Sequence, residues 1–459
     1  MSLTLIGLGI DRGDLSFAAF DALKGADVVF LRTENTRSAT FLKENGIKYL
    51  SFDSFYVNSR TFLSLEKKII SFVKKETKTG KKVVYAVDGA VSEDRAAATL
   101  ALLKGVKIFE GASKVGNALS RCGLNANGYT ALSAYQNELR DFSFPLVVFD
   151  IDSRILASKW KLFLADKIGE ELPVKLLIGG DIKIIPVYEI DRFEGYDYST
   201  VLIVEKPSLT AKERFNANDL FDILYVLRSP DGCPWDKAQS PETILKNMIE
   251  EAYELVDAVK SGDDDKVREE IGDVLMQAAF HTVFAEERGA FDRTDVVTEL
   301  CRKLISRHTH VFGKDKATDG AAALEVWDKN KQKEKGFEGA FDYVSAIPKV
   351  FPACMRAEKT FKRSNKSGII LPDLSADKIS ELAAKYQAEK KEEAAGKLLY
   401  YVVSLVAAGG LSAEETLAAF IDGYLEKMNA VESVFKKENG KAIFDRVDLE
   451  KAYDEIKKP

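Results

Sequence analysis

The spacing of apolar residues changes along the chain and divides it into two regions. Up to about residue 206, short runs of aliphatic and β-branched residues alternate with stretches of helical spacing. The predicted strands are 3–8, 28–31, 83–87, 106–109, 146–151, 174–178, 184–190 and 201–204, and the predicted helices are 15–24, 36–45, 61–75 and 91–104. This alternation is typical of α/β architecture. A break at 111–116 predicts two lobes, 1–112 and 113–206, rather than one large sheet.

From residue 215 to the end, helical spacing prevails and we expect almost no strand. The stretch 207–217 contains a proline and many polar residues and is predicted to be a linker. Beyond it, two apolar stripes are separated by 261–264, which supplies a turn and an N-cap. The first stripe is Ile244, Leu245, Met248, Ala252, Leu255, Val256 and Val259, and the second is Val267, Ile271, Val274, Leu275 and Ala278. The pattern predicts a helical hairpin that buries both stripes.

Four carboxylates occupy matching positions around the two helices, each at the edge of an apolar stripe. Glu251 and Glu254 lie at one rim of the first stripe, and Glu270 and Asp273 lie at the matching rim of the second, because each residue advances about 100° around a helix. A solvated acidic face would account for any single one of them. Two acid pairs with the same phase on adjacent helices instead predict that the hairpin brings four carboxylates toward one spot.

Carboxylates held close together raise one another's pKa, so they cannot all stay ionised unless a cation joins them. Ligation by oxygen alone, without His or Cys, suits a hard ion such as Mg²⁺ or Mn²⁺. Such ions usually bind through carboxylates together with substrate phosphates. The four acids therefore predict a divalent metal site that acts on a phosphate compound.

The same segment carries further landmarks in order. They are Cys-Pro-Trp-Asp-Lys-Ala-Gln at 233–239, Glu-Glu-Ala-Tyr-Glu at 250–254, Glu-Ile-Gly-Asp at 270–273, Lys-Leu-Ile-Ser-Arg-His-Thr-His-Val-Phe at 303–312, and Trp327 with Lys331 four residues on. Over 218–335 the chain resembles the MazG family of nucleoside triphosphate pyrophosphohydrolases. These enzymes are helical, and a second subunit covers the surface of the corresponding hairpin. The resemblance implies a homodimer and a set of site residues. These are Mg²⁺ ligands at Glu251, Glu254, Glu270 and Asp273, catalytic cations at Lys303 and Arg307, and nucleotide contacts at Trp235, Lys303, Arg307, Trp327 and Lys331. Glu250 lies on the same helix as Glu251 but is turned away from the ligand rim, so it is interpreted as a residue that supports the ligands rather than as a ligand.

The α/β region carries a second resemblance, through Leu-Ile-Gly-Leu-Gly-Ile-Asp-Arg-Gly-Asp-Leu-Ser at 5–16, Ala-Asp-Val-Val-Phe-Leu-Arg-Thr-Glu at 26–34 and Val-Val-Tyr-Ala-Val-Asp-Gly at 83–89. It is similar to the tetrapyrrole methylases, S-adenosylmethionine-dependent enzymes with two α/β lobes, and the order of the two regions is similar to bacterial proteins that fuse these modules. The resemblance implies cofactor contacts at Gly7, Gly9 and Asp88. However, the first loop is longer than the family's and lacks its proline, and Asp88 stands where the later loop usually has a proline. These departures predict weak or absent cofactor binding.

Residues 343–445 are predicted to be a second, degenerate copy of the helical module. The stretch 393–399 aligns with 269–275 about a shared glycine, so that Ala394 and Lys397 replace Glu270 and Asp273. Tyr424 and Met428 likewise replace Lys303 and Arg307. The ammonium of Lys397 is expected to pair with Glu393 or Glu381 instead of a metal ion. The second copy is therefore predicted to keep the scaffold without the chemistry.

Composition excludes several classes of protein. A net charge of -6 argues against bulk nucleic-acid binding. Four cysteines, none of them in a CxxC pair, indicate neither a zinc site nor a disulfide scaffold and favour a reducing cytoplasm. The longest apolar run, 398–411, is too short to span a membrane, and the start lacks the features of a signal peptide. His308 and His310 are interpreted as packing at a helix end.

The favoured hypothesis is a Mg²⁺-dependent enzyme that hydrolyses a nucleoside triphosphate to the monophosphate and pyrophosphate, as part of nucleotide house-cleaning. One alternative is a methyltransferase in which the helical part is accessory. The other is a catalytically silent nucleotide-binding regulator. The complete set of landmarks between residues 233 and 331 favours the first hypothesis.

Overall fold

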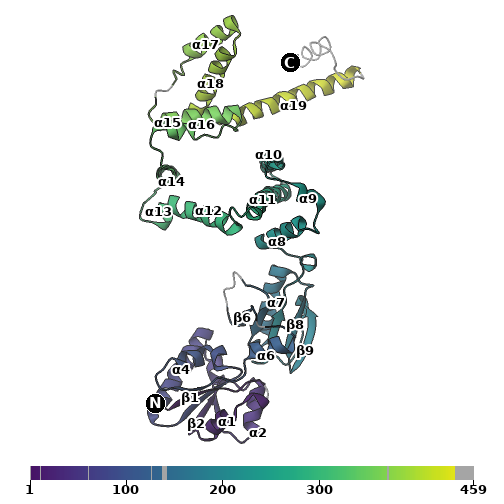
Figure 1. Cartoon of the computed structure of the whole chain (residues 1–459), viewed down its shortest axis with the longest axis vertical. Helices are drawn as coiled ribbons and strands as arrows, with labels where there is room; N and C mark the ends of the chain where they lie inside the picture. The colour runs from purple at the N-terminus through teal and green to yellow at the C-terminus, as the bar shows by residue number, and fades with distance from the viewer. Residues whose placement is uncertain are drawn as a thin grey trace. The chain divides into compact units, whose positions relative to one another are not determined.

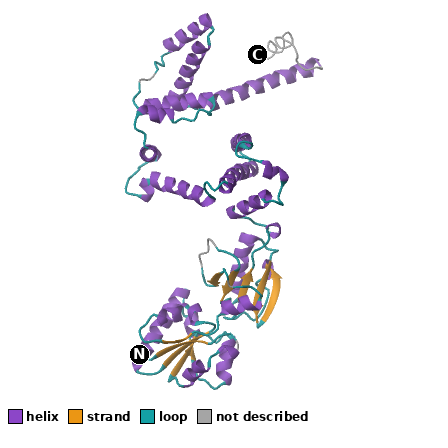
Figure 2. Cartoon of the chain, in the orientation of Figure 1, coloured by secondary structure: helices purple, strands orange, loops and turns teal. Residues whose placement is uncertain are grey.

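The computed structural model describes residues 2–10, 12–59, 61–125, 127–136, 142–369 and 372–439. It divides into two compact units, Met1–Arg293 and Thr294–Pro459 (Figure 1). Within the described residues, every strand lies before residue 205 and only helices follow, as predicted (Figure 2). The division at residue 293 falls inside the predicted helical domain 218–335, whose boundaries stay a prediction.

The first lobe is a parallel sheet covered by helices on both faces. The strand order is β3 (Leu50–Ser51), β2 (Val28–Leu31), β4 (Val83–Val87), β1 (Leu3–Gly7) and β5 (Lys107–Phe109). One face is covered by α1 (Phe17–Lys24) and α2 (Arg37–Glu44), and the other by α4 (Phe62–Glu76) and α5 (Arg95–Ala101). All five residues of β4 are buried, which explains why its sequence is continuously apolar rather than alternating. The short elements are α3 (Asp53–Val57) and the 3-10 turns Arg12–Asp14, Thr77–Thr79 and Val91–Glu93.

The second lobe is a separate mixed sheet, so the predicted two-lobed α/β fold is confirmed. Its order is β6 (Thr130–Ser133), β7 (Leu146–Phe149), β10 (Val201–Val204), β8 (Pro173–Ile178) and β9 (Asp181–Pro186). Helix α6 (Lys114–Arg121) packs on one face and α7 (Arg154–Ile168) on the other. The predicted strand 184–190 is wrong in its bounds. A tight turn at residues 179–180 pairs β9 with β8 from Asp181 onward, and Val187–Glu189 forms a 3-10 turn.

The first unit also contains the predicted helical hairpin, formed by α10 (Leu245–Ser261) and α11 (Asp264–Glu287). The prediction that the hairpin buries both apolar stripes is wrong, because the buried cluster here gathers around the C-terminal half of α11. About half of the surface of each of five stripe residues stays exposed: Leu245, Val256, Val259, Ile271 and Leu275. Gly262 ends α10 with a left-handed φ of 72°, and the Asp263 side chain caps α11 by accepting from the N–H groups of Asp265 and Lys266. Helix α8 (Ala217–Arg228) packs on the C-terminal half of α11 through Leu224. The short helix α9 (Pro234–Ala238) and the 3-10 turn Leu209–Ala211 complete this part.

In the described residues of the second unit, helices are the only regular secondary structure. They are α12 (Arg293–Arg307), α13 (Thr309–Phe312), α14 (Gly320–Lys335), α15 (Ala340–Ser345), α16 (Ala353–Lys366), α17 (Ala376–Glu389), α18 (Glu392–Ala408) and α19 (Ala413–Asn439). A second hairpin, α17–α18, lies in the predicted second copy, of which 440–445 fall outside the described residues. Glu381 is bonded to Lys378 at 2.7 Å, while the Lys397 ammonium lies 6.0 Å from the Tyr401 ring centre. Within the described residues Lys397 forms an ion pair with neither Glu393 nor Glu381, so the expected pairing is wrong. Lys378, one helical turn before Glu381 on the same helix, pairs with that carboxylate instead.

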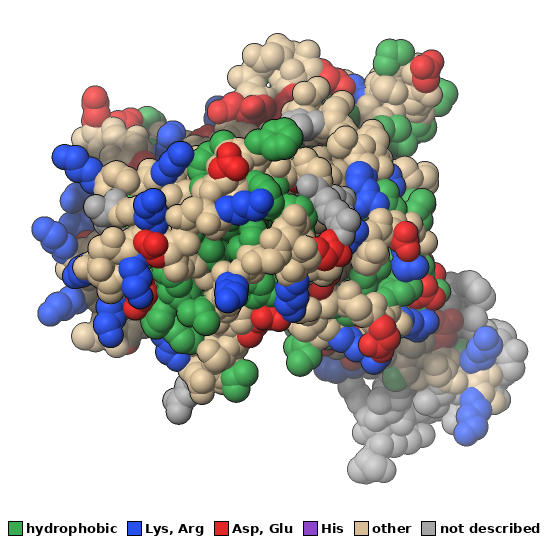
Figure 3. Space-filling model, turned by 90° about the horizontal axis from the view of Figure 1, so that it is seen from below, with side chains coloured by type: hydrophobic (Ala, Val, Ile, Leu, Met, Phe, Trp, Pro, Cys, Tyr) green, Lys and Arg blue, Asp and Glu red, His purple; other side chains and the backbone are tan. Residues whose placement is uncertain are grey.

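Two surface properties bear on the expectations from composition. Within the described residues, no single helix is long and apolar enough to cross a membrane, and α18 with α19 meets those criteria only as a pair bent by 98°. On the face shown in Figure 3, Lys and Arg side chains are interspersed with Asp, Glu and hydrophobic side chains. The predicted lack of nucleic-acid and membrane partners stays a prediction.

Candidate functional site

Three of the four predicted ligand carboxylates converge at the hairpin. Glu251 on α10 and Glu270 and Asp273 on α11 each offer one oxygen, and these oxygens all lie within 4.8 Å of one another. The antiparallel hairpin produces this arrangement because the two acid positions on α11 are three residues apart and so share one face. All three side chains are partly buried against the neighbouring helix.

Electrostatics at this cluster are unfavourable without a cation. Burial raises the pKa of Glu251, and the charges of Asp273, Glu254 and Glu270 raise it further. Burial likewise raises the pKa of Glu270, followed by the charges of Glu254 and Asp273. The Oε2 atom of Glu270 is buried and has no hydrogen-bond partner among the described residues. A buried carboxylate oxygen without a donor costs free energy, which a metal ion would offset.

The two other glutamates of α10, Glu250 and Glu254, differ in their surroundings. Glu254 is exposed and is not one of the three converging groups, yet its charge acts on both Glu251 and Glu270. Glu254 therefore contributes to the negative charge around the cluster. Glu250 is turned toward Lys246, with which it forms an ion pair of 2.8 Å. This agrees with its predicted position away from the ligand rim.

The donor set fits a hard divalent ion. All donors are carboxylate oxygens, and one of them lacks any other partner within the described residues. Mg²⁺ and Mn²⁺ favour such ligands and leave further positions for water and phosphate oxygens. Glu251, Glu270 and Asp273, with Glu254 beside them, are the residues that would hold it.

The predicted cationic and aromatic residues lie in the second unit. Lys303 is ion-paired with Glu299 at 2.6 Å, and Arg307 holds Glu334 through two hydrogen bonds of 2.9 and 2.8 Å. The Arg307 guanidinium lies 5.5 Å, and the Lys331 ammonium 4.6 Å, from the Trp327 ring centre. The structure therefore brings Arg307, Trp327 and Lys331 together within this unit.

The remaining landmarks lie at helix ends. Trp235, on α9, is 61% exposed and so available for contacts. His308 precedes α13, and its Nδ1 lies 2.6 Å from the carbonyl of Leu304, in line with the expected role at a helix end. Sequence analysis missed Arg228, which holds Glu287 of α11 at 2.6 and 2.8 Å and also reaches the carbonyl of Asp236. No local signal identifies Arg228, because its partners lie on other helices.

The loops that would carry S-adenosylmethionine are filled by the chain itself. A Cβ placed on Gly9 would lie 2.1 Å from the side chain of Asp14, whose Oδ2 accepts the N–H of Ile10 at 2.8 Å. A Cβ on Gly89 would lie 2.6 Å from Lys114 Cγ. Lys114 is buried there and ion-paired with Asp150 of the second lobe.

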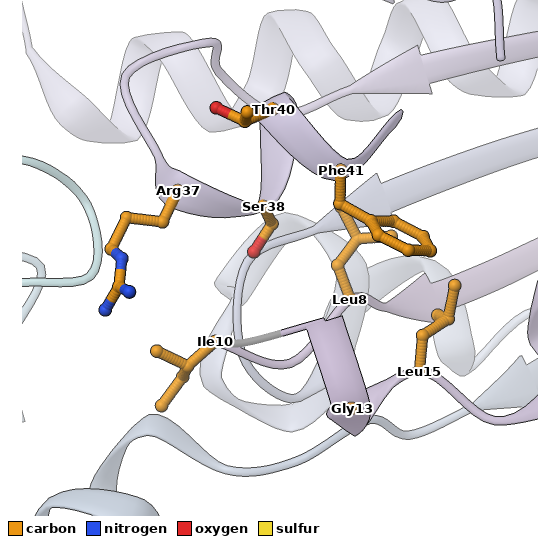
Figure 4. A pocket seen from close by; sticks show the side chains of 8 residues that line it. All are labelled: Leu8, Ile10, Gly13, Leu15, Arg37, Ser38, Thr40 and Phe41. Carbon is orange, nitrogen blue, oxygen red and sulfur yellow. The ribbon is translucent and has the colours of Figure 1, made fainter. Parts of the chain in front are cut away.

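The other predicted cofactor residues are Gly7 and Asp88. Gly7 faces the backbone of Glu110. Asp88 is buried, with Oδ1 accepting from Thr36 and Ser38 and with Oδ2 without a hydrogen-bond partner among the described residues. A pocket of about 480 Å³ lies beside the first loop (Figure 4). Arg37 and Ile10 lie on one side of it, and Leu8, Leu15 and Phe41 on the other. Among the described residues that line it, the only charged side chain is that of Arg37, which offers no counter-charge for the cofactor's ammonium or sulfonium group. The residues do not fit S-adenosylmethionine.

We therefore expect titration of the full chain with S-adenosylmethionine to give no saturable heat at micromolar protein. The physical reason is that binding would have to displace Lys114 and leave Asp150 as an unpaired buried charge, which is strongly unfavourable. Isothermal calorimetry is the measurement, with S-adenosylhomocysteine as a second ligand. Tight binding of one molecule per chain would contradict this expectation.

Comparison with known proteins agrees with both resemblances. Residues 239–312 match the MazG nucleotide pyrophosphohydrolase domain, and residues 2–152 match the tetrapyrrole (corrin/porphyrin) methylases. The chain is 31% identical to the nucleoside triphosphate pyrophosphohydrolase/pyrophosphatase MazG of Thermotoga maritima over 51% of this chain and 91% of that protein. It is 34% identical to the nucleoside triphosphate pyrophosphohydrolase of Escherichia coli K12 over 47% of this chain and 86% of that protein.

A third relative spans both regions. The uncharacterized protein YabN of Bacillus subtilis is 29% identical over 78% of this chain and 76% of that protein. The chain therefore belongs to the MazG nucleotide pyrophosphohydrolase family, with a tetrapyrrole methylase-like region fused at its N-terminal side. Both family assignments made from the motifs are confirmed.

Proposed function

We propose that this protein is a nucleoside triphosphate pyrophosphatase that uses Mg²⁺, or Mn²⁺ in its place, and releases the nucleoside monophosphate and pyrophosphate. The observation that carries the proposal is the convergence of Glu251, Glu270 and Asp273, with an unpartnered oxygen on Glu270. The names of the Thermotoga and Escherichia relatives support the substrate class. The loops beside Gly9 and Gly89 weigh against the methyltransferase alternative.

The reaction asks the protein for positioning and charge neutralisation more than for covalent chemistry. When bound, the metal ion would lower the pKa of a bound water and offset phosphate charge. Attack of a water on the α-phosphorus breaks its bond to the bridging oxygen and releases pyrophosphate. Lys303, Arg307 and Lys331 supply positive charge for the triphosphate, and Trp327 offers a face on which a base can stack.

Two of these cations are neutralised in the structure. Lys303 and Arg307 are held by Glu299 and Glu334, so a triphosphate has to replace those carboxylates as their partner. The exchange is favourable because a triphosphate offers the Arg307 guanidinium more negative charge and more acceptor oxygens than one carboxylate does. The Glu299 and Glu334 pairs therefore hold the cations in place before substrate arrives.

Product analysis tests the proposal directly. A panel of normal and modified nucleoside triphosphates is incubated with the full chain and Mg²⁺, and products are separated by ion-exchange chromatography. We expect monophosphate and pyrophosphate in equal amounts, and no reaction when the divalent ion is chelated. Diphosphate with orthophosphate would place the attack at another phosphorus and contradict the proposal. The panel also identifies the preferred base.

The hairpin exposes an apolar surface that a second copy of the chain would cover. Ile249, Tyr253 and Val259 on α10 are each more than half exposed, as is Ile271 on α11. Their spacing places the α10 residues along one side of the helix. Contiguous exposed apolar surface of this kind marks an interaction site, and two-fold dimers are the commonest oligomer.

We therefore expect a homodimer, measured by light scattering coupled to size exclusion. The double variant Ile249→Asp/Tyr253→Asp should shift the mass to that of the monomer, because each substitution would bury an unpaired charge in the interface. Leu162→Asp on α7 is the matched control, since Leu162 is 65% exposed and lies outside the hairpin. A monomeric wild-type chain at working concentration would contradict the prediction.

A further inference from the structure

Three helices of the second unit present five cations around α14. They are Arg307 on α12, Lys331 on α14, and Lys359, Arg363 and Lys366 on α16, and we call this set the cation ridge. Arg307 reaches α14 through Glu334 and the Trp327 ring. Lys366 of α16 reaches α14 through an ion pair with Asp328. Helix α14 is thus joined to both α12 and α16.

Helical spacing shows which faces of α16 and α14 carry the other cations of the ridge. Lys359, Arg363 and Lys366 are separated by four and three residues, so they lie along one face of α16. On α14, Lys331 follows Asp328 by three residues and shares its face. Because Lys366 is bonded to Asp328, the face of α16 with Lys359 and Arg363 is turned toward the face of α14 with Lys331.

Only two cations of the ridge have a carboxylate partner among the described residues, Arg307 with Glu334 and Lys366 with Asp328. The other three contact neutral groups. Lys331 lies over Trp327 at 4.6 Å, Lys359 lies over Phe351 at 5.6 Å, and Arg363 donates to the carbonyl of Tyr343 at 2.6 Å. Three neighbouring positive charges without an ion-pair partner among the described residues favour the binding of an anion with several negative charges.

The electrostatics of Lys331 agree with this crowding of positive charge. Burial lowers the pKa of Lys331, and the charges of Arg307, Arg363 and Lys359 lower it further, against Asp328 alone. The two cations of α16 therefore act on the same ammonium as Arg307 does. Binding of a polyanion would relieve this repulsion.

We infer that Lys359 and Arg363 of α16 form part of the triphosphate-binding surface together with Lys331. This rests on the proposed function, because the resemblance places Arg307, Trp327 and Lys331 near the nucleotide. Unlike Lys303 and Arg307, the three unpaired cations need no exchange of carboxylate partners when a triphosphate arrives. The second helical repeat thus contributes to substrate binding although it has lost the carboxylates of the metal site.

The test compares two double variants of the full chain with the same change in net charge. Lys359→Ala/Arg363→Ala removes the two cations of the ridge. Lys362→Ala/Lys385→Ala is the matched control, because Lys362 is paired with Glu358 at 2.6 Å on the same helix and Lys385 with Glu389 at 3.8 Å on α17. Each is measured for kcat and KM with a nucleoside triphosphate, and for binding of inorganic tripolyphosphate by calorimetry without divalent ion.

We expect the ridge variant to raise KM about tenfold or more, to leave kcat within about twofold, and to weaken tripolyphosphate binding by a similar factor. The control variant should match the wild type. Because Arg363 also supports the Tyr343 carbonyl, Lys359→Ala alone is measured as a second variant, with Lys359→Arg as the rescue. Thermal unfolding verifies that each variant is folded.

The outcomes separate this inference from the proposed function. If the wild type hydrolyses the triphosphate but the ridge and control variants behave alike in KM and in tripolyphosphate binding, the inference is overturned and the function stands. If the wild type releases no pyrophosphate, the proposed function fails, and the tripolyphosphate titration still decides the ridge. Weaker binding by the ridge variant than by the control supports it, and equal binding overturns it.

Discussion

Replacing Glu270 by Gln is expected to lower the maximal rate of pyrophosphate release about 10²-fold or more. Gln keeps the size of the side chain but removes the charge that a divalent ion needs, and Glu270 carries the oxygen that has no other partner within the described residues. The same loss is expected for Glu251→Gln, Glu254→Gln and Asp273→Asn. The measurement is kcat at saturating triphosphate over a range of Mg²⁺ concentrations.

A second readout distinguishes the loss of a ligand from the loss of the fold. Without divalent ion, Glu270→Gln should unfold at a higher temperature than the wild type, because it relieves repulsion within the cluster. Saturating Mg²⁺ should reverse this order, since only the wild type gains binding free energy. Asp265→Asn is the matched control, as Asp265 is 82% exposed and paired with Arg268 at the start of α11. A Glu270→Gln variant with wild-type kcat would remove Glu270 from the metal site.

The helical hairpin could be predicted because its signals are local. The apolar spacing, the glycine at 262 and the cap at Asp263 all act within a few residues. The phase of Glu251, Glu270 and Asp273 follows from helix geometry once the two helices are antiparallel, which explains their convergence. The position of Glu254 outside the group of three depends on its rotamer, which no spacing rule specifies.

What the sequence could not predict depends on contacts between distant residues. Strand β3 has only two residues, Leu50–Ser51, and exists because it pairs with β2. Lys114 of the second lobe, held by Asp150 of the same lobe, reaches across the lobe boundary and fills the space beside Gly89. Likewise, Lys359 and Arg363 look like an ordinary solvated helix face in the sequence. Only the ion pair between Lys366 and Asp328 turns that face toward α14.

Replacing Glu270 by Ala in the full chain should leave no metal-dependent hydrolysis above background, because the second repeat has no site to take over. On α18, the positions that align with Glu270 and Asp273 hold Ala394 and Lys397. Ala394 is buried and offers no oxygen. The ammonium of Lys397, near the Tyr401 ring, would repel a divalent ion.

The measurement is pyrophosphate release by Glu270→Ala, beside the stoichiometry of Mn²⁺ binding to the same variant. Hydrolysis should fall to the uncatalysed level and Mn²⁺ binding should be lost, while far-ultraviolet circular dichroism matches the wild type. A Glu270→Ala chain that is folded and still hydrolyses its substrate with added metal would show that residues 343–445 hold a working site and that the alignment of the two copies is wrong.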